Sequence, residues 1–284
     1  MDISAYYSDA VRLEEDHLYR PYMPWVRDPD PDPWDHWFWD FTRYDWIDPG
    51  SPYNKPALAF PAQLSGLSTA SYTATLVAFM SGLTAYSSAS PDHCTEFYVN
   101  GVSVGTHSWD GKYTDELVSF AFSSSYLLDG SNTVEAQVCA SPALRDITNY
   151  DWFELDVRRG YQVEDDSLTF DAAEAGWQYR LGGFLTDTIE LFDVSGTYTV
   201  SHLIDAGVTL SDSVYVAAFY DEVAMQGTRY LALTHNRVTS PLAIEEYTPS
   251  NLADPARHAD YIVIAPKDFV ADVQPLVAHR EAQG

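Results

Sequence analysis

The stretch TEFYVNGVSVG, residues 95–105, contains two apolar runs on either side of an Asn-Gly pair. A type I′ turn needs positive φ at both central residues, and Asn100 and Gly101 are residue types that tolerate it. The flanking runs are rich in Val, Tyr and Phe, which favour extended strands. The stretch therefore predicts an antiparallel β-hairpin.

The same kind of pattern continues on both sides of this hairpin. Strand-like runs separated by Gly, Asn, Asp and Ser turns follow one another through residues 55–161. Their number and spacing predict a jelly-roll-type β-sandwich. A further set of short runs in residues 162–248 predicts a second, smaller β-sandwich. The expected fold class is therefore mainly β.

The expected strand pairing places the two cysteines of the chain. If CTEFYV pairs antiparallel with TVEAQVC so that Val99 faces Val134, then Cys94 falls opposite Cys139. Cysteines in this arrangement can form a disulfide in an oxidising compartment, provided that their Cα atoms lie within about 7 Å. The sequence thus makes Cys94 and Cys139 a candidate disulfide. Two cysteines are too few for a disulfide framework.

Residues 1–54 are acidic and rich in Pro and Trp, which predicts an irregular entry segment. Their aromatic tract DHWFWDF, residues 35–41, has two interpretations. Strand alternation would place Trp37 and Trp39 on one face, where they would seal the sandwich core. If exposed, the same rings would form a platform for sugar rings. Burial is the expectation, and the ligand platform is the alternative.

A different pattern occupies the C-terminal part. Residues 261–265, YIVIA, lack polar alternation, which is typical of a strand covered on both faces inside a parallel sheet. Apolar residues then recur at helical spacing from Val270 to Val277. Residues 259–284 therefore predict a βα unit, preceded by a linker at residues 249–258. Because a parallel strand needs neighbours, the simplest explanation is a truncated domain of a second kind.

The charge balance limits the partners of this chain. Its 284 residues include Asp+Glu 42 against Lys+Arg 15, for a formal net charge of -27. Such a surface repels the phosphates of nucleic acids and anionic lipids, so no nucleic acid and no membrane is expected as a partner. No apolar segment reaches the ~18 residues of a membrane helix, and the first residues do not look like a signal peptide. A secreted or cell-surface protein would carry its signal outside this chain.

Several stretches resemble a known family when they are taken together. They are DHWFW at 35–39, DHCTEFYVNGVSVGTHSWDG at 92–111, DGSNTVEAQV at 129–138, GWQYRLGGF with IELFDVS at 176–195, and residues 259–284. In this order they resemble the non-catalytic region and first βα unit of gingipain-like cysteine peptidases. The resemblance implies N-terminal β domains followed by a caspase-like α/β domain, which residues 259–284 would begin.

The chemistry of that family requires a Cys thiolate and a His that keeps it ionised. In the family both lie downstream of the first helix, so no catalytic residue carries over to this chain. The resemblance implies a propeptide-like or accessory β region of a secreted cysteine endopeptidase. This region would be inactive by itself, would need no cofactor and would have the missing caspase-like domain as its partner.

A binding module is the alternative function. Loops at one end of a jelly roll can hold a sugar or a cation, and Asp92, Asp110 and Asp129 fall in predicted loops. Clustered carboxylate oxygens are ligands that calcium prefers, which makes these three residues a candidate calcium site. The simpler interpretation is that each caps a turn through local hydrogen bonds. The alternative is therefore a carbohydrate- or calcium-binding β-sandwich, or an adhesin-like structural protein, with polypeptide or glycan ligands.

Overall fold

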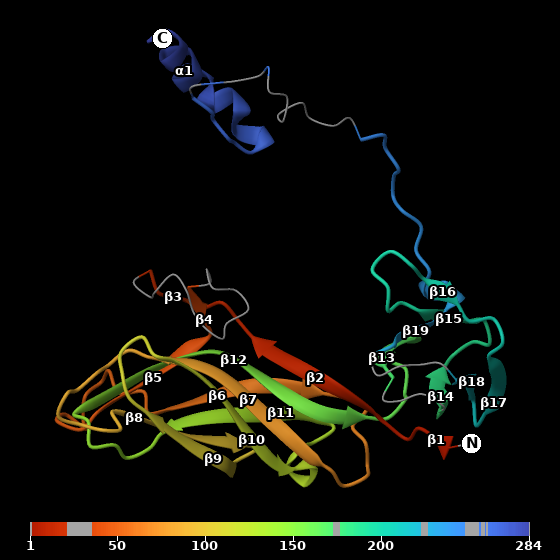
Figure 1. Cartoon of the computed structure of the whole chain (residues 1–284), viewed down its shortest axis with the longest axis horizontal. Coiled ribbons are helices and arrows are strands. Elements are labelled where there is room, and N and C mark those ends of the chain that lie inside the picture. Colours follow the sequence, from red (N-terminus) through yellow and green to blue (C-terminus); the bar gives the residue numbers. More distant parts are fainter. Residues whose placement is uncertain are drawn as a thin grey trace. The chain divides into compact units, whose positions relative to one another are not determined.

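The computed structural model describes residues 2–21, 36–172, 177–222, 227–247, 256, 259 and 261–283. The chain divides into unit 1, Met1–Val238, and unit 2, Thr239–Gly284. All strands of the described residues belong to unit 1, and the α-helix of the described residues belongs to unit 2 (Figure 1). No helix in these residues is long and apolar enough to cross a membrane.

The first sandwich of unit 1 is a jelly roll. Its strands are β2 (Tyr7–Glu14), β5 (Asp40–Asp45), β6 (Ala57–Leu64), β7 (Thr73–Gly82), β8 (His93–Val99), β9 (Val102–Trp109), β10 (Asp115–Ser123), β11 (Gly130–Val138) and β12 (Arg145–Arg159). One sheet has the order β5-β12-β7-β10 and the other has the order β6-β11-β8-β9. These are the two four-stranded sheets of a jelly roll, so this prediction is confirmed. Strand β2 extends the first sheet by pairing with the second half of β12.

Alternating side chains build the core between these two sheets. In β6 every second residue is buried, as its pattern of exposed and buried positions shows. Phe60 of β6 meets Phe153 of the facing sheet, with ring centroids 4.6 Å apart. Pro61 points outward, which is tolerated because β6 is an edge strand. The sequence alternation thus determines which face of each sheet is buried.

The hairpin at residues 95–105 is confirmed. Val99 pairs with Val102, and Asn100 and Gly101 have φ angles of 50° and 76°. The predicted register is also confirmed, since Val134 of β11 lies opposite Val99 of β8. Local turn chemistry was therefore enough to set the pairing of β8 with β9.

The second sandwich of unit 1 is smaller, as predicted. Its strands are β1 (Asp2–Ile3), β13 (Ser167–Asp171), β14 (Trp177–Phe184), β15 (Ile189–Asp193), β16 (Ser201–His202), β17 (Gly207–Ser211), β18 (Val214–Asp221) and β19 (Arg229–Thr234). The sheets have the orders β1-β14-β18-β17 and β13-β19-β15-β16. Aromatic rings from both sheets form its core, among them Phe170, Tyr179 and Tyr230. Short 3-10 helices span Ser124–Tyr126 in the jelly roll and His235–Arg237 after β19.

The prediction that residues 1–54 are irregular is wrong for the part that the structure describes. Strands β2 and β5 both pair with β12, and β1 pairs with β14 of the second sandwich. Strands β3 (Leu18–Tyr19) and β4 (Trp37–Phe38) form a small sheet of their own. The ring of Tyr7 also joins the second core, 5.9 Å from Phe170. This segment therefore belongs to both sandwiches.

Unit 2 confirms the predicted helix but not the predicted strand. Helix α1 (Val270–Glu281) follows a 3-10 turn at Lys267–Phe269. Residues 261–265 form no strand, and the side chains of Ile262 and Ile264 are 74% and 94% exposed. Residues 242–247, which were expected to end the second sandwich, are also exposed and form no strand. The predicted linker at 249–258 lies outside the described residues, apart from Ala256.

Candidate functional site

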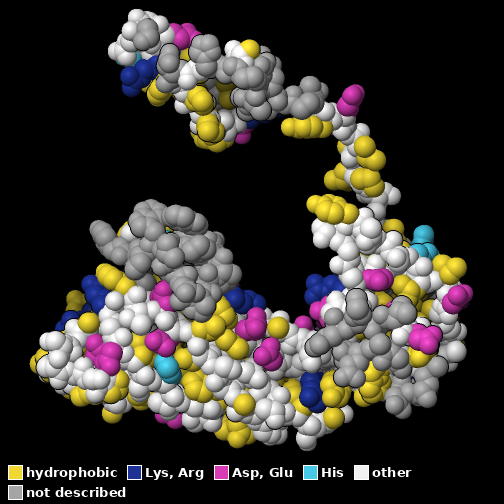
Figure 2. Space-filling view, viewed as in Figure 1, with side chains coloured by type: hydrophobic (Ala, Val, Ile, Leu, Met, Phe, Trp, Pro, Cys, Tyr) yellow, Lys and Arg dark blue, Asp and Glu magenta, His cyan; other side chains and the backbone are white. Residues whose placement is uncertain are grey.

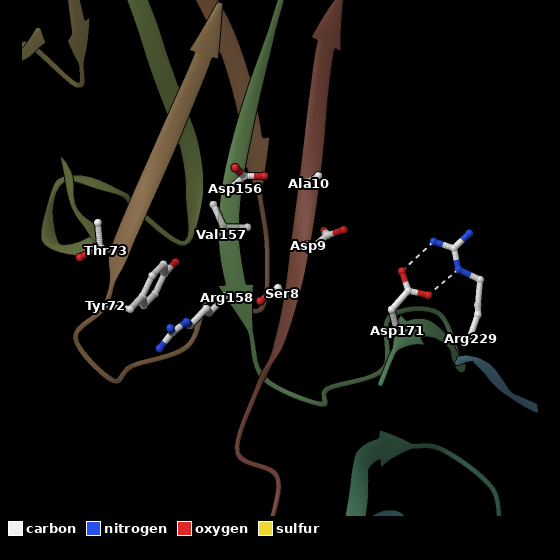
Figure 3. A pocket seen from close by; sticks show the side chains of 10 residues that line it. All are labelled: Ser8, Asp9, Ala10, Tyr72, Thr73, Asp156, Val157, Arg158, Asp171 and Arg229. Atoms are coloured by element: carbon white, nitrogen blue, oxygen red, sulfur yellow. Dashed lines mark hydrogen bonds and ion pairs between the residues drawn. The ribbon is translucent and has the colours of Figure 1, made fainter. Parts of the chain in front are cut away.

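A cavity of about 450 Å³ lies where the first sandwich meets strands of the second (Figure 3). Its floor comes from β2 and β12, and a side wall comes from the start of β7. Asp171 of β13 and Arg229 of β19 add the wall from the second sandwich. Ligand sites occur preferentially in concave regions between domains, so this cavity is the candidate functional site.

Two of the carboxylates in the cavity are paired with arginines. Arg229 donates to Asp171 from Nε and Nη2, at 2.8 and 3.0 Å (Figure 3). Asp9 accepts a hydrogen bond of 2.7 Å from Arg159 Nε. The charges within each pair compensate one another. A charged ligand would therefore have to bind to other groups of the cavity.

Arg158 and Asp156 are the remaining charged groups of the cavity. The guanidinium of Arg158 lies over the rings of Tyr6 and Tyr72, at 4.4 and 5.4 Å from their centroids. Neither Arg158 nor Asp156 has a side-chain hydrogen bond or ion pair within the described residues. Partial desolvation raises the pKa of Asp156 above its ordinary value. The cavity thus presents one cation and one carboxyl group that can still bind a ligand.

The described residues that line the cavity offer polar and charged groups but no Cys–His or Ser–His pair. None of the described residues that line it is a cysteine or a histidine. Nucleophilic catalysis needs a nucleophile and a base within hydrogen-bond reach. Ser8 lies on the floor, but no imidazole accompanies it there.

A second polar cluster is buried at one end of the jelly roll. Nδ1 of His93 lies 2.7 Å from Asp146 Oδ1, and Nε2 of His93 lies 2.9 Å from the carbonyl oxygen of Thr84. Asp146 also accepts from the backbone N–H of Cys94 and from the hydroxyl of Thr148. Since His93 starts β8 and Asp146 lies near the start of β12, this cluster joins the two facing sheets.

The surroundings of His93 favour its protonated form. Both of its ring nitrogens face acceptors, and a neutral imidazole has only one N–H. Burial alone would lower the pKa of His93, but the hydrogen bond and charge of Asp146, with the Thr84 carbonyl and Asp92, raise the pKa above its ordinary value. His93 also stacks on Trp109, with ring centroids 4.8 Å apart. The sequence analysis missed this pair because His93 and Asp146 lie far apart in the chain.

The structure does not bring the three candidate calcium ligands together. Asp92 and Asp110 are neighbours, but Asp92 accepts from the backbone N–H of Tyr86 and Gly111, and Asp110 accepts from the backbone N–H of Asp92. Asp129 is exposed at the opposite end of the β8–β11 pair. No group of three or more His, Cys, Asp or Glu residues in the described ranges could hold a metal ion. Asp92 and Asp110 therefore act as turn caps.

The two candidate platform tryptophans have different environments. Trp39 is 7% exposed and packs against Phe60 at 4.8 Å, whereas Trp37 is 41% exposed and pairs with Tyr19 in the small sheet. The expected alternation is wrong because the strand is interrupted at Trp39, so Phe38 and Trp39 are both buried. A platform of both rings is therefore not formed, and Asp35 lies outside the described residues.

We expect Trp39→Ala to lower the free energy of unfolding by about 3 kcal/mol, because it leaves a cavity in the jelly-roll core. Trp37→Ala is the matched control and should cost less than about 1 kcal/mol, since much of this ring already faces solvent. Urea unfolding of the two variants, followed by circular dichroism, measures both values. Equal losses would contradict the assignment of Trp39 alone to the core.

The candidate disulfide is present. Cys94 and Cys139 are joined with a Cα–Cα distance of 5.1 Å and a sequence separation of 45 residues. The backbone N–H of Cys139 donates to the carbonyl oxygen of Cys94 at 2.9 Å, as expected for neighbouring strand positions. The register of β8 and β11 therefore places both thiols for this bond.

The residues of the cavity were not singled out by the sequence analysis. One signal could have pointed to them, because Arg158 and Arg159 are adjacent cations in a chain that has only 15 Lys and Arg residues. No sequence pattern indicated that Asp171 and Arg229 would line the cavity, since they lie on the separate strands β13 and β19.

Comparison with known proteins identifies the fold. No family model matches the sequence, and no curated protein matches it. The crystal structure of dimeric latent PorU from Porphyromonas gingivalis is similar, with a TM-score of 0.58 and 12% identity, over 84% of this chain and 21% of that chain. The structure of Infectious Bursal Virus derived T=1 particles has a TM-score of only 0.28 at 9% identity, over 98% of this chain and 48% of that chain, and carries no argument. The chain thus has a fold related to that of one part of PorU and spans about a fifth of its length.

Proposed function

We propose that the chain is the non-catalytic β region of a secreted gingipain-like cysteine endopeptidase. The fold likeness to PorU over 84% of the chain is the observation that carries this proposal. The ordered motifs in residues 35–39, 92–111 and 129–138, which resemble the same family, support it from the sequence. In this role the two sandwiches serve as a propeptide-like or accessory scaffold.

The state of the cysteines supports a non-catalytic role. The chain has two cysteines, and both are in the disulfide. A thiolate is the nucleophile of cysteine peptidases, and neither sulfur can supply one while it is oxidised. The disulfide also fits a secreted protein, because such bonds persist in oxidising compartments. The nucleophile would then belong to another part of a longer protein.

Unit 2 supports the presence of a further domain. Apolar side chains are exposed along its described residues (Figure 2), and they include Ile262, Ile264 and Phe269. Large exposed apolar patches mark surfaces that another structure covers. We propose that residues 261–265 and helix α1 begin a caspase-like α/β domain, whose other strands would pair with them.

We expect deletion of residues 239–284 to leave the melting temperature of unit 1 unchanged and to increase its solubility. The reason is that the removed apolar side chains are exposed in the described residues rather than packed in either core. Calorimetry and sedimentation of both chains measure the two effects. A large drop in melting temperature would instead make the tail an integral part of the sandwiches.

Extending the protein is the direct test of the proposal. The chain and the product of its full reading frame would be compared for hydrolysis of Arg- and Lys-containing peptides, with and without a thiol-alkylating reagent. The expected result is alkylation-sensitive hydrolysis by the longer protein only. Thiol-dependent hydrolysis by the chain alone, or a reading frame that encodes no further domain, would overturn the proposal.

A further inference from the structure

The cavity between the sandwiches carries an inference that is independent of the proposed peptidase relation. We infer that it binds a polypeptide segment that presents a carboxylate to Arg158 and a cation or N–H donor to Asp156. These two groups lie on the floor of the cavity, two residues apart on the same face of β12 (Figure 3). Neither side chain forms an ion pair or a side-chain hydrogen bond with another described residue, so no such contact within the fold accounts for them.

Arg158 is prepared to receive a carboxylate. Its stacking on Tyr6 and Tyr72 uses the flat face of the guanidinium and holds the group in place. The five N–H donors lie in the guanidinium plane, so stacking leaves its edge available for two parallel hydrogen bonds. A chain of net charge -27 repels anions in general, so a bound carboxylate needs a local cation such as Arg158.

Asp156 supplies the complementary group. It is exposed in the cavity, and its nearest oppositely charged neighbour in the sequence, Arg158, forms no ion pair with it. The other charges of the cavity are already compensated by the pairs Asp171–Arg229 and Asp9–Arg159. The charges that remain are therefore one positive and one negative, which fits a segment carrying both signs better than a polyanion.

The shape and surface favour a peptide over a sugar acid. About 450 Å³ is enough for a few residues of extended chain, and the side chains of Ser8 and Ala10 on the floor and of Thr73 on the side wall are small. Sugar sites usually offer an aromatic face, but Arg158 already covers the rings of Tyr6 and Tyr72.

A further polar group at the wall is unsatisfied. The hydroxyl of Tyr72 is buried and has no hydrogen-bond partner within the described residues. A buried polar group normally has a partner. A carboxylate bound to the adjacent Arg158 would bring an acceptor to this side of the cavity.

The test is selection of ligands from a random library of capped tetrapeptides on the immobilised full chain, read by mass spectrometry. The expected peptides combine Asp or Glu with Lys or Arg. Titration of the best peptide should show a loss of at least about tenfold in affinity for Arg158→Gln, because a charge-assisted bidentate contact disappears. Arg158→Lys keeps the charge but not the planar fork, so its loss should be smaller.

Matched variants distinguish specific contacts with Arg158 and Asp156 from non-specific attraction to charges elsewhere on the chain. Asp156→Asn should keep the preference for acidic residues and lose the preference for Lys and Arg. Arg180→Gln removes an exposed arginine of β14 outside the cavity and should bind like the parent chain. Replacing the acidic residue of the selected peptide by its amide tests the same contact even where a protein variant folds poorly.

Three outcomes would overturn the inference. They are no enrichment above the blank matrix, an affinity that does not change in Arg158→Gln with an unchanged melting curve, and Arg158-dependent binding of glucuronate without peptide selection. The last result would identify a sugar-acid site instead.

Discussion

Replacing Asp146 with Ala should lower the free energy of unfolding by about 3–5 kcal/mol, because the buried imidazolium of His93 loses its counter-charge. Both side chains are fully buried, so water cannot replace the lost partner. The variant also removes the acceptor for the backbone N–H of Cys94. Denaturant unfolding at about pH 6, followed by tryptophan fluorescence, measures this loss.

Two variants serve as controls for this result. Asp146→Asn keeps the shape and one acceptor oxygen but not the charge, so its loss should be smaller. Asp129→Ala removes an exposed carboxylate at the other end of the jelly roll and should stay within about 0.5 kcal/mol of the parent chain. If Asp146→Ala cost no more than Asp129→Ala, the buried pair would not stabilise the fold.

The same pair gives the stability a defined dependence on pH. Because the fold raises the pKa of His93, its contribution is fully present below the ordinary histidine pKa of about 6.5 and is lost as the pH rises through the folded pKa. The stability difference between the parent chain and His93→Gln should therefore decrease from mildly acidic to alkaline pH. A difference that stays constant over this interval would contradict the protonated state.

Removing the disulfide is the other change with a large expected effect. A double variant, Cys94→Ala with Cys139→Ala, should lose about 4 kcal/mol, because an uncrosslinked unfolded chain gains the entropy of a loop of 45 residues. Guanidinium unfolding without reductant measures the difference.

Adding reductant provides the internal control for the disulfide. It should destabilise the parent chain by a similar amount and leave the double variant unchanged. Equal stability of the oxidised parent and the double variant would show that the bond does not stabilise the fold. Because Cys94 also donates to Asp146, the effects of the disulfide and of Asp146 should not be additive.

The features that could be predicted from the sequence depend on local chemistry. Asn100 and Gly101 fix a turn, and the turn sets the pairing of Val99 with Val102 in the hairpin. The helical spacing after residue 269 likewise predicts α1. In these cases the signal lies within a few residues of the structure that it predicts.

The features that could not be predicted depend on distant partners. Strand β2 has no strong local pattern and forms because β12 offers it an edge. Residues 261–265 have the composition of a covered strand, yet a strand needs neighbours, and none pairs with them in the described residues. Trp37 and the cavity depend in the same way on how separate strands meet. A single sequence shows propensity but not which segment will provide the partner.

Strand β12 also determines when the first sheet of the jelly roll can form during protein synthesis. It is the common neighbour of β2, β5 and β7, so three segments made earlier must remain unpaired with it until Arg145–Arg159 leaves the ribosome. At roughly 5–20 residues per second, the wait for β2 is on the order of 10 s. During this interval the nascent chain exposes the apolar faces and free edges of an unfinished sheet. The sheet can therefore close only when its central strand, which is also the last of its strands to be made, has been inserted.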